Sequence, residues 1–395
     1  MEWIDAKSAA ERLGVKPATL YAYVSRGVLK RRYDPDHRRS LFDPAEVEEL
    51  ARRGKPRRRP APTEIAIESR ITTFGADRPY YRGHDAIDLA QRYRFEEVAE
   101  LLWCGELSDT GPWHCRSAAV ATARAVQVAL PGELLPLDRL HLAVTALAVS
   151  DPLRFQRDPD AVAATGRALI AGMVEALPQL SPPVGRSIAE MLWSRLSSRR
   201  PSGPQELRAV DAALILLADH ELAASTFAAR VAASARADPY AIVGCGLGVL
   251  GGPLHGGSSL AVERMLAEIT EPTTVPRVIG DRLRRGERIP GFGHAVYRGG
   301  DARGVELWRL LRTIAPVHPK VIAAEVILTE LRTRRLPEFN CDLPLAVLGY
   351  VLDMIPGASE TIFAVARTAG WLAHAIEEYA SDTLIRPRAI NPADR

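Results

Sequence analysis

The sequence predicts an all-α body over residues 65–395, preceded by a small, basic helix-turn-helix domain. From Glu64 onward alanine and leucine dominate, alternating runs of β-branched residues are absent, and glycine or proline recurs at helix-length intervals. Residues 1–62 hold 15 Lys and Arg against 9 Asp and Glu, a surplus of +6 within a net charge of +3, so the remainder carries −3. A basic head on a mildly acidic body indicates a separate module with an anionic partner.

The head begins with a predicted helix over Ala6–Leu13, in which apolar residues recur on one face. Gly14 and Val15 then form a tight turn. Pro17 suits the first turn of a second helix, which runs through Val24 and ends at Gly27. This helix-turn-helix spacing is typical of domains that read a DNA groove.

A basic hairpin follows, with arginine pairs on both sides of the turn at residues 34–36 and a third helix from Ala45. This order resembles the winged helix-turn-helix of MerR-type regulators and phage excisionases over about residues 3–53. The resemblance implies a DNA-binding domain at 1–53, with phosphates held by the arginines of the wing. The implied DNA-binding residues are Thr19, Tyr21, Arg26, Arg31, Arg32, Arg38 and Arg39. The alternative is a protein-docking domain whose arginines are simply solvated.

A linker is predicted over residues 54–64. The stretch from Arg52 to Pro62 contains three prolines and six positive charges, a composition that cannot pack into a core. The linker therefore separates the head from the body.

Helices dominate the pattern of the body. The clearest are predicted over Leu140–Val149, Asp160–Leu177, Gln205–Ala218 and Glu221–Ala237. No glycine-rich phosphate loop follows a strand, which argues against nucleotide-binding folds with a parallel sheet.

Two histidines stand among glycines, His255 within Gly252–Gly257 and His294 within Gly291–Arg298. Glycine lets backbone amides approach a ligand closely, because no side chain intervenes. A structural histidine usually has bulky apolar neighbours instead. The two segments therefore predict a ligand site.

These segments also carry a resemblance to citrate synthase that runs from about Ile67 to Arg388. The matching segments occur in the family's order with sensible gaps. They are Ser69–Thr72, Tyr81–Gly83, Phe95–Ala99, Ala218–Glu221, Gly252–Gly257, Gly291–Arg298, Ala366–Trp371 and Ile385–Arg388. The resemblance implies the citrate-synthase fold, with large and small helical domains and a smaller mobile subdomain at about 257–345.

The resemblance implies condensation of an acyl-CoA with the ketone of oxaloacetate, followed by thioester hydrolysis. Asp342 matches the catalytic base, His255 the donor to the enolate, and His294 the group that polarises the ketone. The residues that match the oxaloacetate clamp are His220, Arg303, Arg367 and Arg386. In the family the last of these arginines comes from the partner subunit, which implies a homodimer. Arg298 matches a contact to CoA phosphate.

The leading interpretation is a citrate synthase-like acyltransferase that uses acetyl-CoA, with a possible DNA-binding role. The alternatives are a 2-methylcitrate synthase that uses propionyl-CoA and a metabolite-sensing transcription regulator with little turnover. Asp342 favours an enzyme, because a pure sensor needs no base, whereas the head favours a regulator. Leu343–Ala346 replaces the family's aromatic pair and Ser-Gly, which changes the wall beside the acyl group.

Other features narrow the function. The four cysteines show no CxxC pairing, so we expect reduced, mostly buried thiols in a cytoplasmic protein. No secretory signal, membrane span, metal-ligand spacing or cofactor motif is present, and acyl-CoA counts as a substrate. The histidines without a motif are expected to be structural or exposed. They are His84, His114, His141, His318 and His374.

Overall fold

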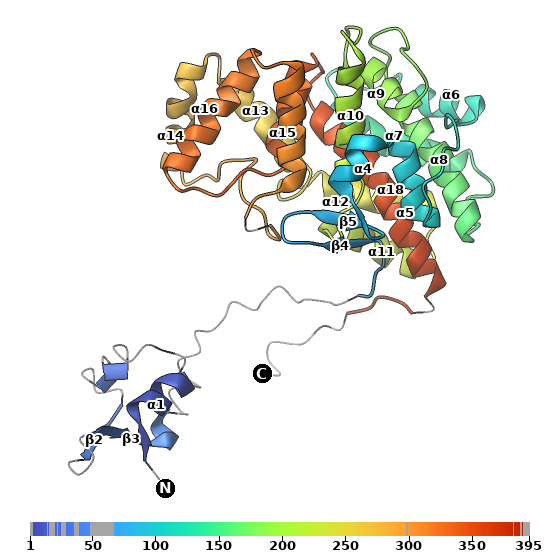
Figure 1. Ribbon diagram of the computed structural model, residues 1–395. Coiled ribbons are helices and arrows are strands. Elements are labelled where there is room, and N and C mark those ends of the chain that lie inside the picture. Colours follow the sequence, from blue (N-terminus) through green and yellow to red (C-terminus); the bar gives the residue numbers. More distant parts are fainter. Residues whose placement is uncertain are drawn as a thin grey trace. The chain divides into compact units, whose positions relative to one another are not determined.

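The computed structural model describes two compact units, Met1–Glu68 and Ser69–Arg395 (Figure 1). The described residues are 3–13, 15, 20–21, 23–24, 29–34, 39–47, 67–297, 299–381, 383–387 and 389.

The first unit contains helix α1 (Ala6–Leu13), at the predicted place, and a three-stranded antiparallel sheet in the order β1-β3-β2. The strands are β1 (Ile4–Asp5), β2 (Arg31–Asp34) and β3 (Arg39–Phe42). A small core of Ala9, Ala10, Leu20, Leu29, Phe42 and Val47 holds them together. Much of the predicted second helix lies outside the described residues, so the winged helix-turn-helix stays a prediction.

The second unit is helical, in agreement with the prediction for the body. Its α-helices are α4 (Ala86–Arg92), α5 (Phe95–Cys104), α6 (Ser117–Ala125), α7 (Pro136–Val149), α8 (Pro159–Ala176), α9 (Ile188–Leu196), α10 (Pro204–Leu217), α11 (Ala224–Ser234), α12 (Pro239–Leu250), α13 (Gly257–Glu268), α14 (Val275–Arg284), α15 (Ala302–Ile314), α16 (Pro319–Thr333), α17 (Asp342–Val351) and α18 (Ala358–Ala380). A 3₁₀ turn, η1 (Pro272–Thr274), precedes α14.

A small antiparallel sheet at the start of this unit was not predicted. It consists of β4 (Thr72–Phe74), β5 (Pro79–Tyr81) and β6 (His84–Asp85) in that order. Strands of two or three residues are too short to show an alternating pattern, which explains why the sequence did not reveal them.

One predicted helix start is wrong. The segment Glu221–Ala237 was expected to be helical, but α11 begins only at Ala224. Glu221 has a φ of +51°, in the left-handed region, and its amide donates to the carboxylate of Asp219 at 3.1 Å. A residue in this conformation cannot continue a right-handed helix, so residues 219–221 form a turn instead.

Helix α18 is buried along almost its whole length and packs against α5, α8, α10, α11, α12 and α17 (Figure 1). The helix comes closest to the 219–221 turn at Gly370, whose amide donates to the Ala218 carbonyl at 3.1 Å. A Cβ at Gly370 would collide with Asp219 Oδ1 and with that carbonyl. Glycine is therefore needed here, and it lets α18 bring Arg367 next to the turn.

Helices α13 to α16 stand together beside the other helices of the unit (Figure 1). Helix α17 packs against α13, α15 and α16 and also reaches α18. The first helix of the group begins two residues after His255, and α17 begins at Asp342. Two predicted site residues, His255 and Asp342, therefore lie just before or at the start of a helix.

All four cysteines are unpaired, but only Cys341 is buried, while Cys104 and Cys245 are exposed. The expectation of mostly buried thiols is therefore wrong. None of the helices in the described part of the chain is long and apolar enough to cross a membrane.

Candidate active site

The structure brings together six of the predicted site residues from loops, helix starts and the middle of α18, which are far apart in the sequence. His220 and His294 lie with ring centroids 5.2 Å apart, and Nε2 of the latter is 3.4 Å from Arg303 Nη2. The charges of Arg303 and Arg367 act on His220, and that of Arg367 acts on His255. The charge of Arg303 also acts on the carboxyl group of Asp342.

His255 is held by a hydroxyl. Its Nε2 lies 2.6 Å from Ser225 Oγ, which in turn accepts a hydrogen bond from Trp371 Nε1 at 3.2 Å. Burial, followed by the charge of Arg367, lowers the pKa of His255 to about 4, so the ring is neutral at pH 7. Because Ser225 Oγ already accepts from Trp371, we assign its hydroxyl proton to the bond with Nε2, which puts the ring proton on Nδ1, where it is available to a ligand.

His294 is fixed by the backbone. Its Nδ1 accepts from the amides of Val296 at 3.0 Å and Tyr297 at 3.2 Å. Burial and the charge of Arg303 lower the pKa of this ring to about 4. A neutral ring that accepts two amides at Nδ1 carries its proton on Nε2, so the 3.4 Å separation from Arg303 Nη2, which can only donate, is a close contact and not a hydrogen bond. His294 therefore offers one N–H donor from Nε2.

His220 lies 3.0 Å through Nε2 from the hydroxyl of Tyr297. Its pKa is held well below the usual value by burial first and then by the charges of Arg303 and Arg367. The three histidines of the cluster are therefore neutral donors rather than cations, and the positive charge of the site comes from arginine.

Asp342 is a carboxylate with raised basicity. It is buried, with 8% of its surface exposed, at the first residue of α17. Burial raises its pKa to about 6, although a hydrogen bond from Ser258 and the charge of Arg303 act in the opposite direction. A carboxylate with this pKa can accept a proton near neutral pH.

The two arginines differ in their partners. Asp301 Oδ1 and Oδ2 each accept from Arg303, from Nε and Nη2 respectively, at 2.9 Å. Arg367 Nε donates to the Leu217 carbonyl at 2.8 Å, but its Nη1 is buried and has no hydrogen-bond partner among the described residues. Buried donors are rarely left unpaired, so Arg367 points to an anionic ligand that completes the site.

Three residues with clear contacts were missed by the sequence analysis. Asp301 pairs with Arg303, Ser225 with His255, and Tyr297 with His220. Tyr297 lies inside the glycine-rich segment that was recognised, and that was its only signal. Nothing in the sequence pairs Ser225 with a histidine 30 positions away.

Arg386 is a described residue of the body that was predicted for the site but does not join this cluster. Arg386 is exposed, beyond the end of α18, and no hydrogen bond or ion pair within the described residues joins it to the cluster. Arg298 lies outside the described residues, as do Thr19, Arg26 and Arg38 of the head. The described head residues that were predicted to bind DNA are all exposed. They are Tyr21, Arg31, Arg32 and Arg39.

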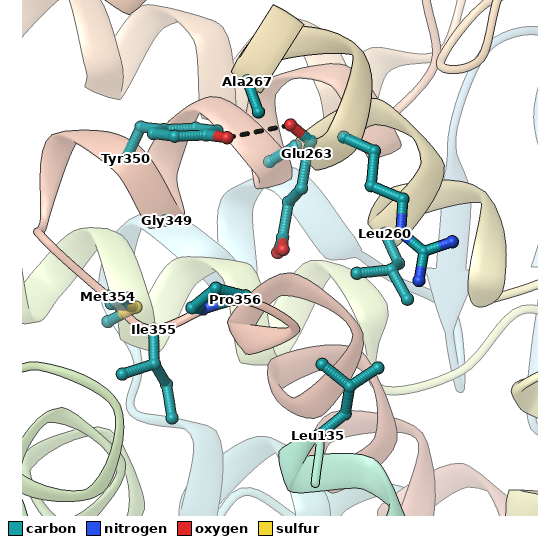
Figure 2. Close-up of a pocket in the computed structure, with 11 residues that line it drawn as sticks. Leu135, Leu260, Glu263, Ala267, Gly349, Tyr350, Met354, Ile355 and Pro356 are labelled. Carbon is teal, nitrogen blue, oxygen red and sulfur yellow. Dashed lines mark hydrogen bonds between the residues drawn. The ribbon is translucent and has the colours of Figure 1, made fainter. Parts of the chain in front are cut away.

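The structure also contains a cavity of about 300 Å³ (Figure 2). It opens between α13, α17 and the segment before α18, and its lining is mostly apolar, with Leu260, Tyr350 and Ile355 among the residues. None of the six clustered residues lines it. Within the described residues, no group of three or more His, Cys, Asp or Glu side chains is arranged to hold a metal ion.

The fold and the cluster together define a helical protein in which buried arginines lie close to neutral histidines, a set of groups suited to an anionic ligand. Residues 63–388 match the family described as "Citrate synthase, C-terminal domain". The chain belongs to the citrate synthase family.

Relatives with two different names resemble the chain to a similar degree. It is 32% identical to 2-methylcitrate synthase 1 of Corynebacterium glutamicum, over 78% of this chain and 87% of the relative. It is 33% identical to citrate synthase 2 of Bacillus subtilis, over 82% of this chain and 93% of the relative.

Solved structures confirm the citrate synthase fold of the body. Citrate synthase from Thermotoga maritima superposes with a TM-score of 0.70 at 27% identity, covering 84% of this chain and 94% of that one. Citrate synthase from Thermoplasma acidophilum, in a ternary complex with carboxymethyl coenzyme A and oxaloacetate, superposes with a TM-score of 0.70 at 26% identity, covering 85% of this chain and 96% of that one.

Proposed function

We propose that this protein condenses acetyl-CoA with oxaloacetate and water to give citrate and CoA. The observation that carries the proposal is the buried Asp342, whose pKa is raised to about 6 beside neutral histidines and an arginine with a free buried donor. A site that only bound a metabolite would have no need of a carboxylate with raised basicity.

Each group has a step in the proposed reaction. Asp342 removes a proton from the carbon beside the thioester carbonyl, and His255 donates from Nδ1 to the enolate oxygen that forms. His294 donates from Nε2 to the ketone of oxaloacetate, which makes its carbon electrophilic. The enolate carbon bonds to that carbon, and water then hydrolyses the thioester and releases CoA.

The binding of oxaloacetate is assigned to His220, Arg303 and Arg367. The free Nη1 of Arg367 supports a carboxylate contact, because guanidinium groups pair well with both oxygens of a carboxylate. Arg298 is proposed to contact CoA phosphate.

Release of free thiol in the presence of oxaloacetate and a panel of acyl-CoAs tests the proposal. We expect acetyl-CoA to give the highest kcat/KM. The relatives named 2-methylcitrate synthase favour propionyl-CoA as the alternative, and a higher kcat/KM with propionyl-CoA would establish it. Oxaloacetate binding without thiol release from any acyl-CoA would instead favour a metabolite-sensing regulator.

Activity is expected to depend on pH through Asp342. Because the pKa of this carboxyl is raised to about 6, its protonated form gains population as pH falls below that value and the base is lost. His255 and His294, with pKa values of about 4, stay neutral over this range. We expect log(kcat/KM) to fall below pH 6 with a slope of about one. A profile that stays flat down to about pH 5 would contradict this assignment.

A homodimer is proposed to complete the site with Arg386. Helix α12 contains no charged residue, and its accessible face consists of small residues, namely the exposed Ala241, Cys245 and Gly248 and the half-buried Gly244. A Cβ at either glycine would have nothing within 4 Å, so this face is open to a close helix contact. An uncharged exposed face of this kind supports a subunit interface.

The head is proposed to bind DNA. Arg31 and Arg32 on β2 and Arg39 on β3 are exposed on one antiparallel hairpin, as expected for a wing that holds phosphates. The alternative is a protein-docking role for the same surface.

Anisotropy titration with DNA from the promoter of the gene checks this role. We expect affinity to fall steeply with salt, and the double variant Arg31→Ala/Arg32→Ala to reduce the salt slope by about two. The double variant Arg277→Ala/Arg284→Ala removes the same charge from the exposed surface of α14 and serves as the control. Equal losses in both double variants, or affinity no greater than for random DNA, would leave the head as a docking module.

A further inference from the structure

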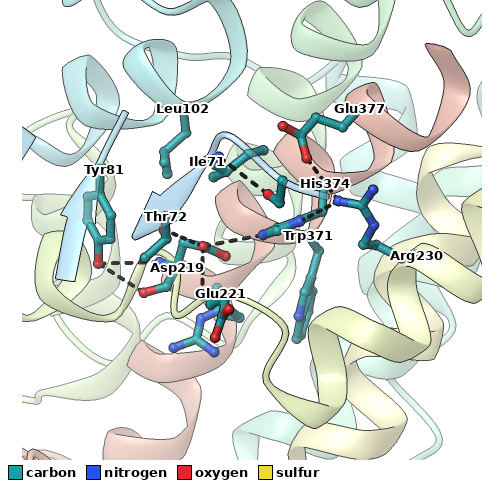
Figure 3. Close-up of polar contacts among 12 residues, drawn as sticks. Ile71, Thr72, Tyr81, Leu102, Asp219, Glu221, Arg230, Trp371, His374 and Glu377 are labelled. Atoms are coloured by element: carbon teal, nitrogen blue, oxygen red, sulfur yellow. Dashed lines mark hydrogen bonds and ion pairs between the residues drawn. The ribbon is translucent and has the colours of Figure 1, made fainter. Parts of the chain in front are cut away.

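A buried polar network is centred on Asp219, the residue that precedes His220 in the sequence (Figure 3). Asp219, the preceding residue, is fully buried, and its Oδ2 accepts three hydrogen bonds. The donors are Thr72 Oγ1 at 2.6 Å, the amide of Glu221 at 3.1 Å and His374 Nε2 at 3.4 Å. The residue on each side of His220 is thus fixed through one carboxylate oxygen.

The backbone of Asp219 is held as well. The hydroxyl of Tyr81 donates to its carbonyl at 3.1 Å and lies 3.4 Å from its amide nitrogen (Figure 3). Glu221 has a left-handed φ of +51°, a conformation that costs energy for a residue with a side chain. The hydrogen bond from Glu221 to the Asp219 carboxylate stabilises this turn and therefore the direction in which His220 points.

His374 reaches Asp219 in one defined tautomer. Arg230 Nη1 lies 3.1 Å from Nδ1 of the ring, and because a guanidinium can only donate, that nitrogen accepts and Nε2 carries the proton. Arg230 is itself paired with Glu377 and Glu378, each at 2.9 Å. The ring is fully buried on α18, the helix that also carries Arg367.

Asp219 remains charged in this environment. Burial raises its pKa, but His374, Arg367 and the Thr72 hydroxyl outweigh burial and hold the pKa below the usual value. Its second oxygen, Oδ1, is buried without a hydrogen-bond partner among the described residues. A carboxylate next to the turn therefore provides the negative charge that balances Arg367.

We propose that Asp219 and His374 are positioning residues, which together hold His220 and Arg367 in the geometry that binds the substrate dicarboxylate. The pair acts through these two residues and does not touch the substrate. This inference rests on the proposed function, because it assumes that the two residues bind oxaloacetate. A network that only joined α11 to α18 would affect stability alone.

The test compares oxaloacetate binding and turnover across matched variants of the full-length protein. Asp219→Asn keeps the shape of the side chain and removes its charge. His374→Leu removes both ring nitrogens, whereas His374→Gln keeps a donor toward Asp219 and an acceptor toward Arg230. Asp211→Asn is the control, because Asp211 is a buried carboxylate on α10 that accepts from the Phe95 amide at 2.9 Å and takes no part in the network.

We expect Asp219→Asn and His374→Leu to raise both the KM and the calorimetric Kd for oxaloacetate roughly tenfold or more, with a smaller change in kcat. His374→Gln should restore most of the affinity. Asp211→Asn should leave both constants unchanged.

Two results separate the inference from the proposed function. Equal oxaloacetate affinity in wild type and in both Asp219→Asn and His374→Leu, with only the melting temperature lowered, would overturn the positioning role. Wild-type protein that binds oxaloacetate but releases no thiol from any acyl-CoA would overturn the proposed activity, and weaker binding by Asp219→Asn would still support the positioning role. If Asp219→Asn does not fold, the comparison of His374→Leu with His374→Gln still tests the positioning role.

Discussion

Replacing Asp342 with asparagine is expected to lower turnover by at least about 10³ while leaving the fold and oxaloacetate binding intact. The carboxylate is the only group in the described cluster with both the burial and the raised pKa, about 6, that proton removal beside a thioester requires. Asparagine has the same shape but cannot accept the proton.

The same substitution should not weaken folding. Burial disfavours the charged form of Asp342, which is why its pKa is raised, and the neutral amide avoids that cost. Because the pKa of Asp342 is raised in the folded protein, the protonated carboxyl group contributes to stability at low pH. This contribution is lost as pH rises through about 6. We therefore expect an unchanged or higher melting temperature at pH 7.

The measurements are thiol release at saturating substrates, calorimetric binding of oxaloacetate and thermal unfolding. Turnover close to wild type would remove Asp342 from the mechanism. A loss of oxaloacetate binding equal to the loss of turnover would instead make Asp342 a binding residue.

The loops that carry His255 and His294 could be predicted from the sequence because the signal lies in the residues next to each histidine. Glycines around His255 and His294 mark places where the backbone approaches a ligand, and that signal needs no knowledge of the fold. The helices over Leu140–Val149, Asp160–Leu177 and Gln205–Ala218 were predicted from equally local signals, namely helical periodicity with glycine or proline at helix-length intervals. In the structure each of the corresponding helices, α7, α8 and α10, has proline in its first turn.

The parts that the sequence did not reveal depend on contacts between distant segments. The turn at Glu221 is set by the carboxylate two residues before it and by Thr72, 147 positions from Asp219. His374 had no motif and was expected to be structural or exposed, yet it lies 3.4 Å from that carboxylate. Such pairs exist only after α18 has packed against the turn, so no local pattern records them.

The predicted role of Arg386 cannot be read from a single chain, because it depends on a second copy of the chain. In one chain the residue is exposed beyond α18, and the amide of the preceding residue, Ile385, donates to Ser234 at 3.1 Å. The segment is therefore attached to the end of α11 while the Arg386 side chain remains accessible. This arrangement suits a contact with a partner subunit and can be tested by mixing two inactive variants.

Hybrid dimers of Arg386→Ala and His255→Ala chains are expected to recover activity that neither variant has alone. Each single variant should lose at least about 10² in turnover, because one lacks a substrate clamp and the other the donor to the enolate. If Arg386 acts across the interface, a hybrid contains one site with both residues intact and one site with neither. Hybrids purified through a different affinity tag on each chain should therefore show about half the wild-type turnover per dimer. Hybrids assembled from Arg386→Ala chains alone, carrying both tags, control for the purification. An inactive hybrid would place Arg386 in the site of its own chain, because then neither half of the dimer would hold both residues. Full activity of Arg386→Ala alone would place the residue outside any site.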